Sequence, residues 1–387
     1  FTDLFSNQYD KQTNKKRHHL KGLQHTTIDV MGVSDHLIPN HLQFVFLCQI
    51  STDEHEAHLM VVTSLYRYLV ASRDIQAGEV IVEAPALAVG PCSGCGLICL
   101  GCYRELDETN LCPGCEWPLC SSECPGRGQD TGHSSYECEA LKGAAPSYDD
   151  IEDLKESYHA IICLLLRTAH PARWAAVRTM EAHDELRRAR GDIWPANERL
   201  VLRRLRAWGF RFDDAEVHTV CGILEVNAFE VGGGGASARA LYAAACLLAH
   251  DCTPSTTHTD AERRAGRPLT VRAAVPHRAG DVISLCYAYT LQGTLKRREH
   301  IRLSKFFECR CRRCADPTEL GTHASALRCP RCAGRVLPAA PLDPAASWRC
   351  LAPGCAYAMT APAVHAMLER CVRHIVLVEE GGWTFTI

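Results

Sequence analysis

Residues 99–138 read CLGCYRELDETNLCPGCEWPLCSSECPGRGQDTGHSSYEC and place eight potential metal ligands within forty positions. Seven of these ligands are cysteines and one is a histidine. Short spacing within a pair lets both side chains reach one tetrahedral Zn²⁺, so the stretch predicts two zinc sites. The ligands form four close pairs: Cys99 with Cys102, Cys112 with Cys115, Cys120 with Cys124, and His133 with Cys138.

Disulfide bonds are the alternative use of these cysteines, and they need an oxidising compartment. In the sequence we find neither a cleavable signal segment nor an apolar run long enough to span a bilayer. The 23 cysteines therefore favour metal binding in a reducing compartment, which we expect to be nuclear or cytoplasmic, without a membrane partner.

The spacing of the four pairs resembles that of a MYND zinc finger. The resemblance implies an interleaved arrangement, in which the first and third pairs share one zinc ion and the second and fourth pairs share the other. Four residues separate His133 from Cys138, where the usual pattern has three. Cys92 and Cys95, just upstream, form a competing first pair that could exchange with Cys99 and Cys102.

The composition is that of an ordinary globular chain, with 47% hydrophobic and 22% charged residues. A length of 387 residues allows two or three domains. The net charge is only -3, and MYND spacing lacks the helix-in-groove arrangement of nucleic-acid fingers, so we do not expect direct nucleic-acid binding. We interpret the arginine clusters at 187–190 and 203–206 as solvated helix faces, while a local basic face elsewhere stays open.

Upstream of the cysteine-rich stretch, residues 1–63 show no sustained periodicity, and an apolar run at 42–50 is either a strand or an isolated patch. The chain begins at Phe1 and stops at Ile387, and we expect it to be a fragment. Order is expected from near residue 65, with a β-hairpin over 68–82 around a turn at 76–78. Since further strands follow only after a long helical stretch, the pattern predicts one domain interrupted by an insertion.

Apolar residues recur every three or four positions from 151 to 165 and predict a helix that ends near Pro171. Further helices are expected over 174–190, over 198–208, and from Asp213 to about 229. Residues 232–235 should form a flexible loop, and residues 241–248 a short apolar helix. Strands at 269–275 and 282–289, separated by a turn at 276–281, then precede a basic helix or turn at 296–305.

Cys309, Cys311 and Cys314 supply three thiols in six residues, so one tetrahedral position needs a ligand from elsewhere, and Cys252 is the candidate. A fourth zinc is expected at Cys329, Cys332, Cys350 and Cys355, which have ribbon-like spacing and nearby Pro and Gly residues for knuckle turns. Elemental analysis should therefore find three to four zinc ions per chain. Six other cysteines have no partner at ligand spacing, and we expect most to be buried as small apolar residues: Cys48, Cys163, Cys221, Cys246, Cys286 and Cys371.

The order of these parts resembles that of the SET-and-MYND (SMYD) family of protein-lysine methyltransferases, over about residues 64–360. The parts follow one another in this order: a strand pair, an inserted finger, a helical segment, a His250-x-Cys252-x-Pro254 loop, a strand ending in Cys286-Tyr287 and a Cys-x-Cys-x2-Cys tail. The stretches Asn227-Ala-Phe-Glu230 and Asp316-Pro-Thr-Glu-Leu-Gly321 resemble an arthropod branch.

This resemblance implies an α+β fold, in which a SET-type, β-rich domain is interrupted by a MYND finger and a helical insert and is followed by a zinc-binding post-SET tail. It implies that Cys252 joins the three tail cysteines around a third zinc beside the methyl-transfer site. The expected segments are a poorly defined N-terminal part (1–63), the first part of the SET domain (64–91), the finger (92–145), the helical insert (146–230), the SET core (231–305), the post-SET and ribbon-like part (306–360) and a truncated C-terminal part (361–387).

The resemblance also implies S-adenosylmethionine as cofactor and the lysine of a histone or another protein as substrate. By position, Tyr287 is the residue expected to orient the lysine amine, while Arg67, His250 and Phe307 are expected to bind the cofactor. Without the resemblance, Tyr287, His250 and Phe307 read as a core tyrosine, a capping histidine and a core phenylalanine.

Four positions depart from the family pattern. Tyr66-Arg67-Tyr68 replaces a Gly-x-Gly turn, and Ala249 replaces an asparagine expected to hydrogen-bond the cofactor. Ser255 stands where asparagine is usual, and Lys305 where an aromatic residue is usual, unless Phe306 substitutes for it.

Two functions follow from these observations. The first is a protein-lysine methyltransferase, and the second is a catalytically silent SET scaffold or transcriptional regulator whose finger binds proline-rich peptides. Trp117 could be an exposed platform for such a peptide, or it could close the finger's own small core.

Overall fold

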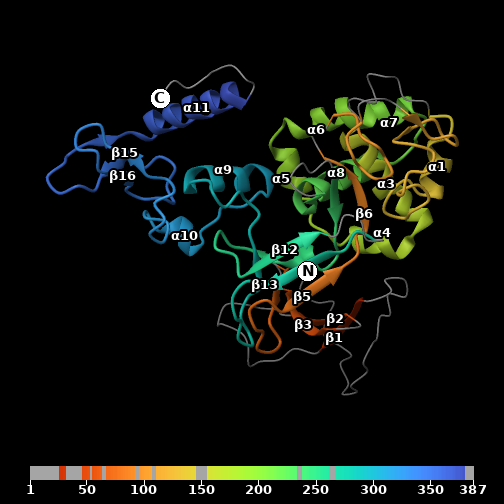
Figure 1. Cartoon of the computed structure of the whole chain (residues 1–387), viewed down its shortest axis with the longest axis horizontal. Coiled ribbons are helices and arrows are strands. Elements are labelled where there is room, and N and C mark those ends of the chain that lie inside the picture. Colours follow the sequence, from red (N-terminus) through yellow and green to blue (C-terminus); the bar gives the residue numbers. More distant parts are fainter. Residues whose placement is uncertain are drawn as a thin grey trace, which may run out of the picture. The chain divides into compact units, whose positions relative to one another are not determined.

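The computed structural model describes residues 26–31, 46–52, 55–62, 67–92, 96–106, 110–144, 155–232, 238–260 and 266–379. The chain forms two compact units. The first contains Phe1–Ala249 and Ser255–Ser284, and the second contains His250–Pro254 and Leu285–Ile387. Helices and strands both contribute to the structure, as expected for an α+β chain (Figure 1). In the described part of the chain, every helix is too short or too polar to cross a membrane.

The first unit begins with a four-stranded antiparallel sheet in the order β1-β2-β3-β4. Its strands are β1 (Thr26–Met31), β2 (Phe46–Thr52), β3 (His55–Val62) and β4 (Arg67–Val70). Strand β2 confirms the strand interpretation of the apolar run at 42–50, within the residues described. Regular structure thus begins well before residue 65, where the sequence first predicted it.

The predicted hairpin over 68–82 is wrong, although both of its strands exist. Strand β4 pairs with β3, whereas β5 (Val80–Ala84) pairs with β13 (Leu269–Ala273), which also pairs with β12 (Thr256–Asp260). Between the two strands, the backbone of Ile75 exchanges two hydrogen bonds of 2.9 Å with His277. Partners distant in the sequence therefore satisfy the backbone groups that a local hairpin would have used.

A second sheet of this unit has the order β6-β10-β9, formed by β6 (Ala88–Pro91), β10 (Ala238–Leu241) and β9 (Phe229–Val231). The helix expected over 241–248 is wrong. Leu241 ends β10 opposite Ala88, and only η2 (Ala245–Leu247) forms a single 3₁₀ turn. Strand pairing therefore takes up only the first residue of the expected helix, and the small residues after it form no more than a short turn.

The helical insert packs around α3 (Lys155–Ala169), which contacts β6, α4 (Pro171–Val177) and α8 (Asp214–Asn227) (Figure 1). The helix expected after Asp213 is α8, and Asp213 caps it, since its carboxylate accepts from the Glu216 N–H at 2.9 Å. The single helix expected over 174–190 is instead α4 and α5 (Asp184–Ala189), with His183 at a φ of +53° between them. The helix expected over 198–208 is a continuous run of α6 (Ile193–Asn197), the π-helical η1 (Glu198–Leu202) and α7 (Arg203–Ala207).

The interpretation of the arginine cluster at 187–190 as a solvated helix face is wrong for Arg187. Its side chain is 2% exposed and donates to the His218 carbonyl oxygen at 2.8 Å. Gly222 on α8 leaves room for it, because a Cβ there would lie 2.6 Å from the guanidinium. Arg188, Arg190 and Arg203 are exposed, as predicted.

The second unit contains α9 (Thr294–Ser304), α10 (Arg312–Ala315), a small sheet and α11 (Ala361–Glu379). Of the helix or turn expected at 296–305, the structure has the helix, α9. The chain passes between the units within β11 (Ala249–His250) and β14 (Ser284–Leu285). The sheet has the order β15-β16-β17-β18, with β15 (Leu327–Arg328), β16 (Arg335–Pro338), β17 (Trp348–Cys350) and β18 (Ala358–Met359).

Candidate functional site

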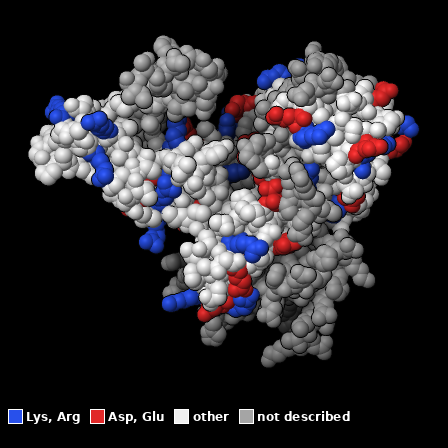
Figure 2. Space-filling view, in the orientation of Figure 1, with Lys and Arg blue, Asp and Glu red and all other residues white. Residues whose placement is uncertain are grey.

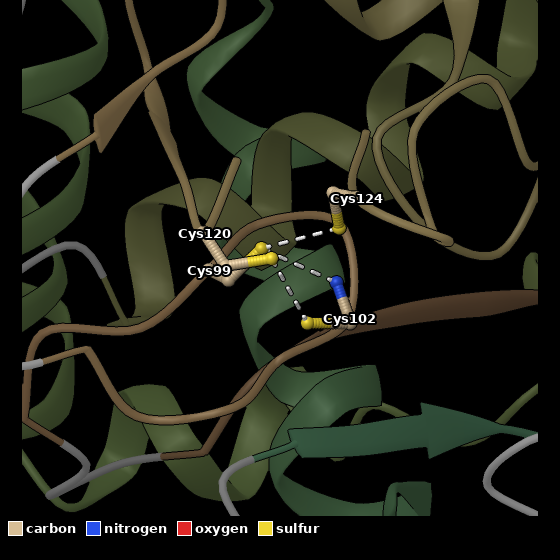
Figure 3. Close-up of side chains that lie close together, drawn as sticks. All are labelled: Cys99, Cys102, Cys120 and Cys124. Atoms are coloured by element: carbon tan, nitrogen blue, oxygen red, sulfur yellow. Dashed lines mark hydrogen bonds between the residues drawn. The ribbon is translucent and has the colours of Figure 1, made fainter. Parts of the chain in front are cut away.

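The finger brings together its first predicted ligand set. The thiols of Cys99, Cys102, Cys120 and Cys124 point toward one another, and their ligand atoms all lie within 4.8 Å (Figure 3). The Sγ atoms of Cys99 and Cys124 are 3.5 Å apart, and those of Cys102 and Cys120 are 3.9 Å apart. Four Zn–S bonds of about 2.3 Å in a tetrahedron would separate the sulfurs by roughly 3.8 Å. The donors therefore fit zinc, and the separations are far longer than the roughly 2.05 Å of a disulfide.

The second set of the finger contains Cys112, Cys115, His133 and Cys138. Cys112 and Cys138 have Sγ atoms 3.7 Å apart, and Cys115 Sγ lies 3.3 Å from His133 Nε2. Burial lowers the pKa of His133 to about 4, so the imidazole is neutral and its lone pair is free for a metal. The first ligand pair converges with the third, and the second converges with the fourth, so the interleaved arrangement is confirmed. Cys92 is buried outside these sets, and Cys95 lies outside the described residues.

Glycines in the finger allow separate segments of its backbone to approach each other closely. A Cβ at Gly126 would lie 2.0 Å from the Gly101 carbonyl oxygen, and one at Gly132 would lie 2.4 Å from the Gly126 carbonyl oxygen. Only glycine permits these approaches. Directly after His133, Ser134 and Glu137 form a capping box at the start of α1 (Ser135–Leu141), the helix that carries Cys138.

Trp117 lies between the ligand pairs and is completely buried. Its indole N–H donates to the Ala144 carbonyl oxygen at 2.8 Å. Its ring lies 5.7 Å from that of Tyr158 on α3 and 5.0 Å from that of Trp208, which follows α7. The interpretation as an exposed peptide platform is therefore wrong, and the indole closes a core that extends beyond the finger into the helical insert.

The third set lies in the second unit, where Cys252 joins Cys309, Cys311 and Cys314 as predicted. Cys252 Sγ is 3.9 Å from Cys309 Sγ and 3.5 Å from Cys314 Sγ. These separations again match the edges of a zinc tetrahedron.

His250 connects this set to Tyr287. Its Nδ1 accepts a hydrogen bond from the Tyr287 backbone N–H at 2.9 Å, which assigns the ring proton to Nε2. Nε2 lies 3.3 Å from Cys252 Sγ and donates to that sulfur. The ring centroid of His250 is 5.1 Å from that of Tyr287 and 5.8 Å from that of Phe307. Three residues singled out for cofactor and substrate therefore cluster beside the third set, and all three are half-buried.

A buried charge network around the third set was not predicted. The Arg297 guanidinium is fully buried, donates to Glu319 at 2.7 Å, and lies 3.7 Å from Cys314 Sγ. Arg313 donates to the Cys252 carbonyl oxygen at 3.3 Å, and its Nε lies 3.3 Å from the same Glu319 carboxylate. Burial alone would raise the pKa of Glu319, but hydrogen bonds from Ser325 and Arg297 bring it below its ordinary value, so the carboxylate is ionised. In sequence, Arg297 and Glu319 look like surface residues of a basic helix and a turn.

The turn that presents Glu319 is the Asp316–Gly321 stretch. The Asp316 carboxylate accepts from the Thr318 N–H at 2.8 Å and the Leu320 N–H at 2.9 Å. Glu319 and Leu320 have φ angles of +53° and +58°. Such conformations are costly for residues other than glycine, and here the Asp316 hydrogen bonds and the buried ion pair hold them in place.

The fourth set, Cys329, Cys332, Cys350 and Cys355, converges as predicted. Its Sγ separations are 3.8 Å between Cys329 and Cys355 and 3.4 Å between Cys332 and Cys350. Val336, Trp348 and Val364 pack against the cysteines in a small core. We call residues 327–359 the ribbon.

Several predicted residues lie outside these sets. Tyr66 and the side chain of Arg67 are not among the parts described, so their proposed effects on the cofactor stay predictions. Phe306, the possible substitute for the missing aromatic residue, has a φ of +61° and is half-buried. Five of the six cysteines without a partner at ligand spacing have a described side chain. Cys163 is fully buried and Cys371 is exposed, while the other three are half-buried: Cys221, Cys246 and Cys286.

No family model matches this chain. "SET domain-containing protein SmydA-8, isoform A" of Drosophila melanogaster is 32% identical over 298 residues, which cover 74% of this chain and 62% of that protein. Its isoform B is 31% identical over 306 residues, covering 74% and 64%. "N-lysine methyltransferase SMYD2" of Gallus gallus is 25% identical over 259 residues, covering 64% and 57%. The chain thus spans less than two thirds of the length of these curated relatives.

Among solved structures, the "SET domain of LSMT bound to Lysine and AdoHcy" covers 65% of this chain and 53% of that chain, with 13% identity and a TM-score of 0.31. That likeness is too weak to assign a function. The SmydA-8 matches agree with the order of segments and with the four ligand sets. On this evidence the chain is similar to proteins of the SET and MYND domain-containing (SMYD) family, and the two SmydA-8 matches support a likeness to its arthropod branch.

Proposed function

We propose that this chain carries the S-adenosylmethionine-dependent protein-lysine methyltransferase activity of its family. The observation that carries the proposal is the His250 ring, which accepts from the Tyr287 backbone and donates to a cysteine of the third set. The name of the SMYD2 relative, an N-lysine methyltransferase, supports the same activity.

Methyl transfer to an amine is an in-line displacement, so it depends on alignment more than on strong acids or bases. When bound, S-adenosylmethionine supplies the methyl group as an electrophile. The Tyr287 hydroxyl is assigned to orient the lysine amine. His250 fixes the backbone at Tyr287 through the 2.9 Å hydrogen bond, and the third metal set anchors His250 in turn.

The half-buried rings of His250 and Phe307 suit a flat adenine, which supports their assignment to the cofactor. The loop that carries His250 is itself held in place, because the Asp251 carboxylate accepts from the Thr253 N–H at 2.7 Å and its hydroxyl at 2.8 Å. A preorganised loop lowers the entropic cost of binding. The assignment of Arg67 to the cofactor stays a prediction of the resemblance.

The test combines calorimetric titration with S-adenosylmethionine and methylation of a panel of proteins. Tyr287→Phe should lower the methylation rate roughly 10- to 100-fold, the effect of one hydrogen bond to a charged group, and leave cofactor affinity unchanged. Tyr289→Phe is the matched control, because Tyr289 is 59% exposed two residues away and should have no effect. Equal rates for wild type and Tyr287→Phe would remove Tyr287 from the reaction.

The silent scaffold is the alternative favoured by the replaced residues Tyr66 and Ala249. The double variant Tyr66→Gly with Ala249→Asn restores the family pattern. If the natural chain neither binds the cofactor nor methylates any protein, and the double variant gains both, the scaffold replaces the enzyme. A gain in affinity of about 1–3 kcal/mol is expected from one or two restored hydrogen bonds.

Capture of proline-rich peptides by the finger also stays a prediction. Trp117 cannot provide the surface, because it is buried. Leu111 of β7 (Asn110–Leu111), which is 49% exposed, is the one large apolar side chain exposed on the described part of the finger.

A further inference from the structure

The ribbon has an unusual charge composition for this chain. Residues 327–359 contain four arginines, no lysine and one acidic residue, whereas acidic residues outnumber basic ones in the chain as a whole. Arg328, Arg331, Arg335 and Arg349 are all exposed. Figure 2 shows blue atoms and almost no red over the part of the molecule where Figure 1 labels β15 and β16.

The strand register places three of these arginines on one face of the sheet. Arg328 on β15 lies directly opposite Arg335 on β16. Arg349 on β17 lies opposite Leu337, two residues from Arg335 along β16 and therefore on the same side. Leu337 is buried, while the three arginines are exposed. We call Arg328, Arg335 and Arg349 the arginine face.

The other face of the sheet is the core side. Val336 lies opposite Cys350, and both pack with Trp348 and with Val364 of α11. By the alternation along the strands, Cys329 and Cys350 also point to this side. The arginine face is therefore not the side that bears these thiolates, and its charges are left for another partner.

The protein supplies no such partner in the described residues. No carboxylate there lies within 4.0 Å of the four ribbon arginines, although Arg297, Arg298 and Arg302 of the same unit each have a glutamate at that distance. The ribbon's acidic residue, Asp343, instead accepts from the Ala345 N–H at 2.9 Å within its own turn. Like charges placed directly opposite each other across two strands destabilise a sheet. The Arg328–Arg335 pair thus costs stability, and nothing described in the fold offsets it.

We propose that the arginine face binds the phosphate backbone of a nucleic acid. Guanidinium groups bind phosphates in a bidentate manner, and the absence of lysine in the ribbon matches that use. The arginines lie on neighbouring strands, so their positive charges are spaced as the strands are. The sheet offers no helix that could enter a groove, so we expect contacts with the phosphate backbone and no recognition of the base sequence. The net charge of -3 describes the whole chain, and it does not exclude phosphate binding by a face that gathers its positive charge locally.

The experiment measures fluorescence anisotropy of a short labelled DNA oligonucleotide, single-stranded and duplex, with the complete chain in its zinc-loaded form. The triple variant Arg328→Gln/Arg335→Gln/Arg349→Gln should bind about 10- to 50-fold more weakly at physiological salt. It should also lower the slope of log affinity against log salt by about 2 for the single strand, since each neutralised phosphate contributes about 0.7. The triple Arg→Lys variant keeps the charge and should retain part of the affinity.

The matched control is Arg104→Gln/Arg178→Gln/Arg203→Gln, which removes the same charge from exposed positions of the first unit. It should bind DNA like the wild type. Equal loss in both triple variants, or no loss in the ribbon variant, overturns the proposal. Stronger binding of polyglutamate than of either oligonucleotide, with the same dependence on the three arginines, overturns it in favour of an acidic polypeptide.

A measurement of thermal stability and zinc content distinguishes loss of DNA binding by the arginine face from unfolding of the ribbon. Arg335→Gln removes the repulsion from Arg328, so the ribbon should keep its zinc and become slightly more stable to heat while DNA binding falls. If Arg335→Gln releases zinc, the arginine serves the fold and the proposal fails.

Discussion

In the finger (residues 96–144), Trp117 is fully buried against rings that belong to the helical insert, whereas in the ribbon Trp348 packs with Val336 and Val364 in a small cluster around its own cysteines. Both regions hold tetrahedral cysteine sets with nearly equal ligand separations. Their chemistry is the same, but their dependence on the rest of the unit differs.

A zinc module can thus be part of a larger apolar core, or it can depend mainly on its bound metal for stability. The finger shares one continuous apolar cluster with α3, η1, α7 and α8. In the ribbon, Cys332 is exposed and only a few apolar side chains surround the ligands. Metal binding should therefore stabilise many helical contacts in the first case and mainly local structure in the second.

Zinc removal should give the largest effect and test this comparison directly. Four sets predict up to four zinc ions per chain, and structural sites contribute on the order of 10 kcal/mol each. A strong chelator should unfold the ribbon locally, and in the first unit it should also expose the amides of α3. Hydrogen exchange measures both responses, and elemental analysis gives the metal content. Protected α3 amides after complete loss of the finger's zinc would show that the helical insert does not depend on that metal. Two or fewer zinc ions in intact protein would contradict the four-set assignment.

Trp117→Ala should be the most harmful single substitution in the finger, because a fully buried indole is lost and leaves a cavity. We expect α3 amides to open more easily by about 4 kcal/mol, measured by hydrogen exchange. Leu111→Ala is the control, because its side chain is already 49% exposed and its effect should be below about 0.5 kcal/mol. Equal protection in the two variants would show that the finger is independent of the insert.

Glu319→Gln tests whether the third set depends on buried charge more than on apolar packing. The substitution leaves Arg297 and Arg313 buried beside the cysteines without their carboxylate, so stability should fall by about 3 kcal/mol. The rate of zinc transfer to a colorimetric chelator should rise accordingly. The double variant Arg297→Met with Glu319→Leu replaces the pair by apolar groups, and it should recover part of the loss. A double variant as unstable as the sum of the two single changes would argue against a coupled pair.

Arg173→Gln should have the smallest effect, although it removes a visible contact between the insert and the finger. Arg173 donates to Asp130 at 3.2 Å, but the Asp130 side chain is 54% exposed, so solvent screens the pair. Thermal unfolding should change by less than about 1 kcal/mol. A loss as large as that of Trp117→Ala would mean that ion pairing and not burial holds the finger in place.

The sequence alone determined the close ligand pairs, because metal ligands occur as short local pairs whose spacing is set by the reach of two side chains. It also predicted α3 and α8, because apolar periodicity and the acidic residues before a helix are properties of neighbouring residues. The family resemblance implied the interleaving of pairs, which the structure confirms. It also implied the roles of Tyr287 and His250, which stay predictions.

Only the tertiary structure decided which strands pair, where Trp117 lies, and which charges are buried. Strands β4 and β5 are neighbours in sequence, yet their partners are β3 and β13, because backbone groups pair wherever the fold brings them together. Arg297 and Glu319 form a fully buried pair, while Arg328 and Arg335 face each other in solvent, and no local pattern separates these arginines. Burial and strand register depend on contacts between residues far apart in the chain, and these contacts determine the electrostatic environment of each side chain.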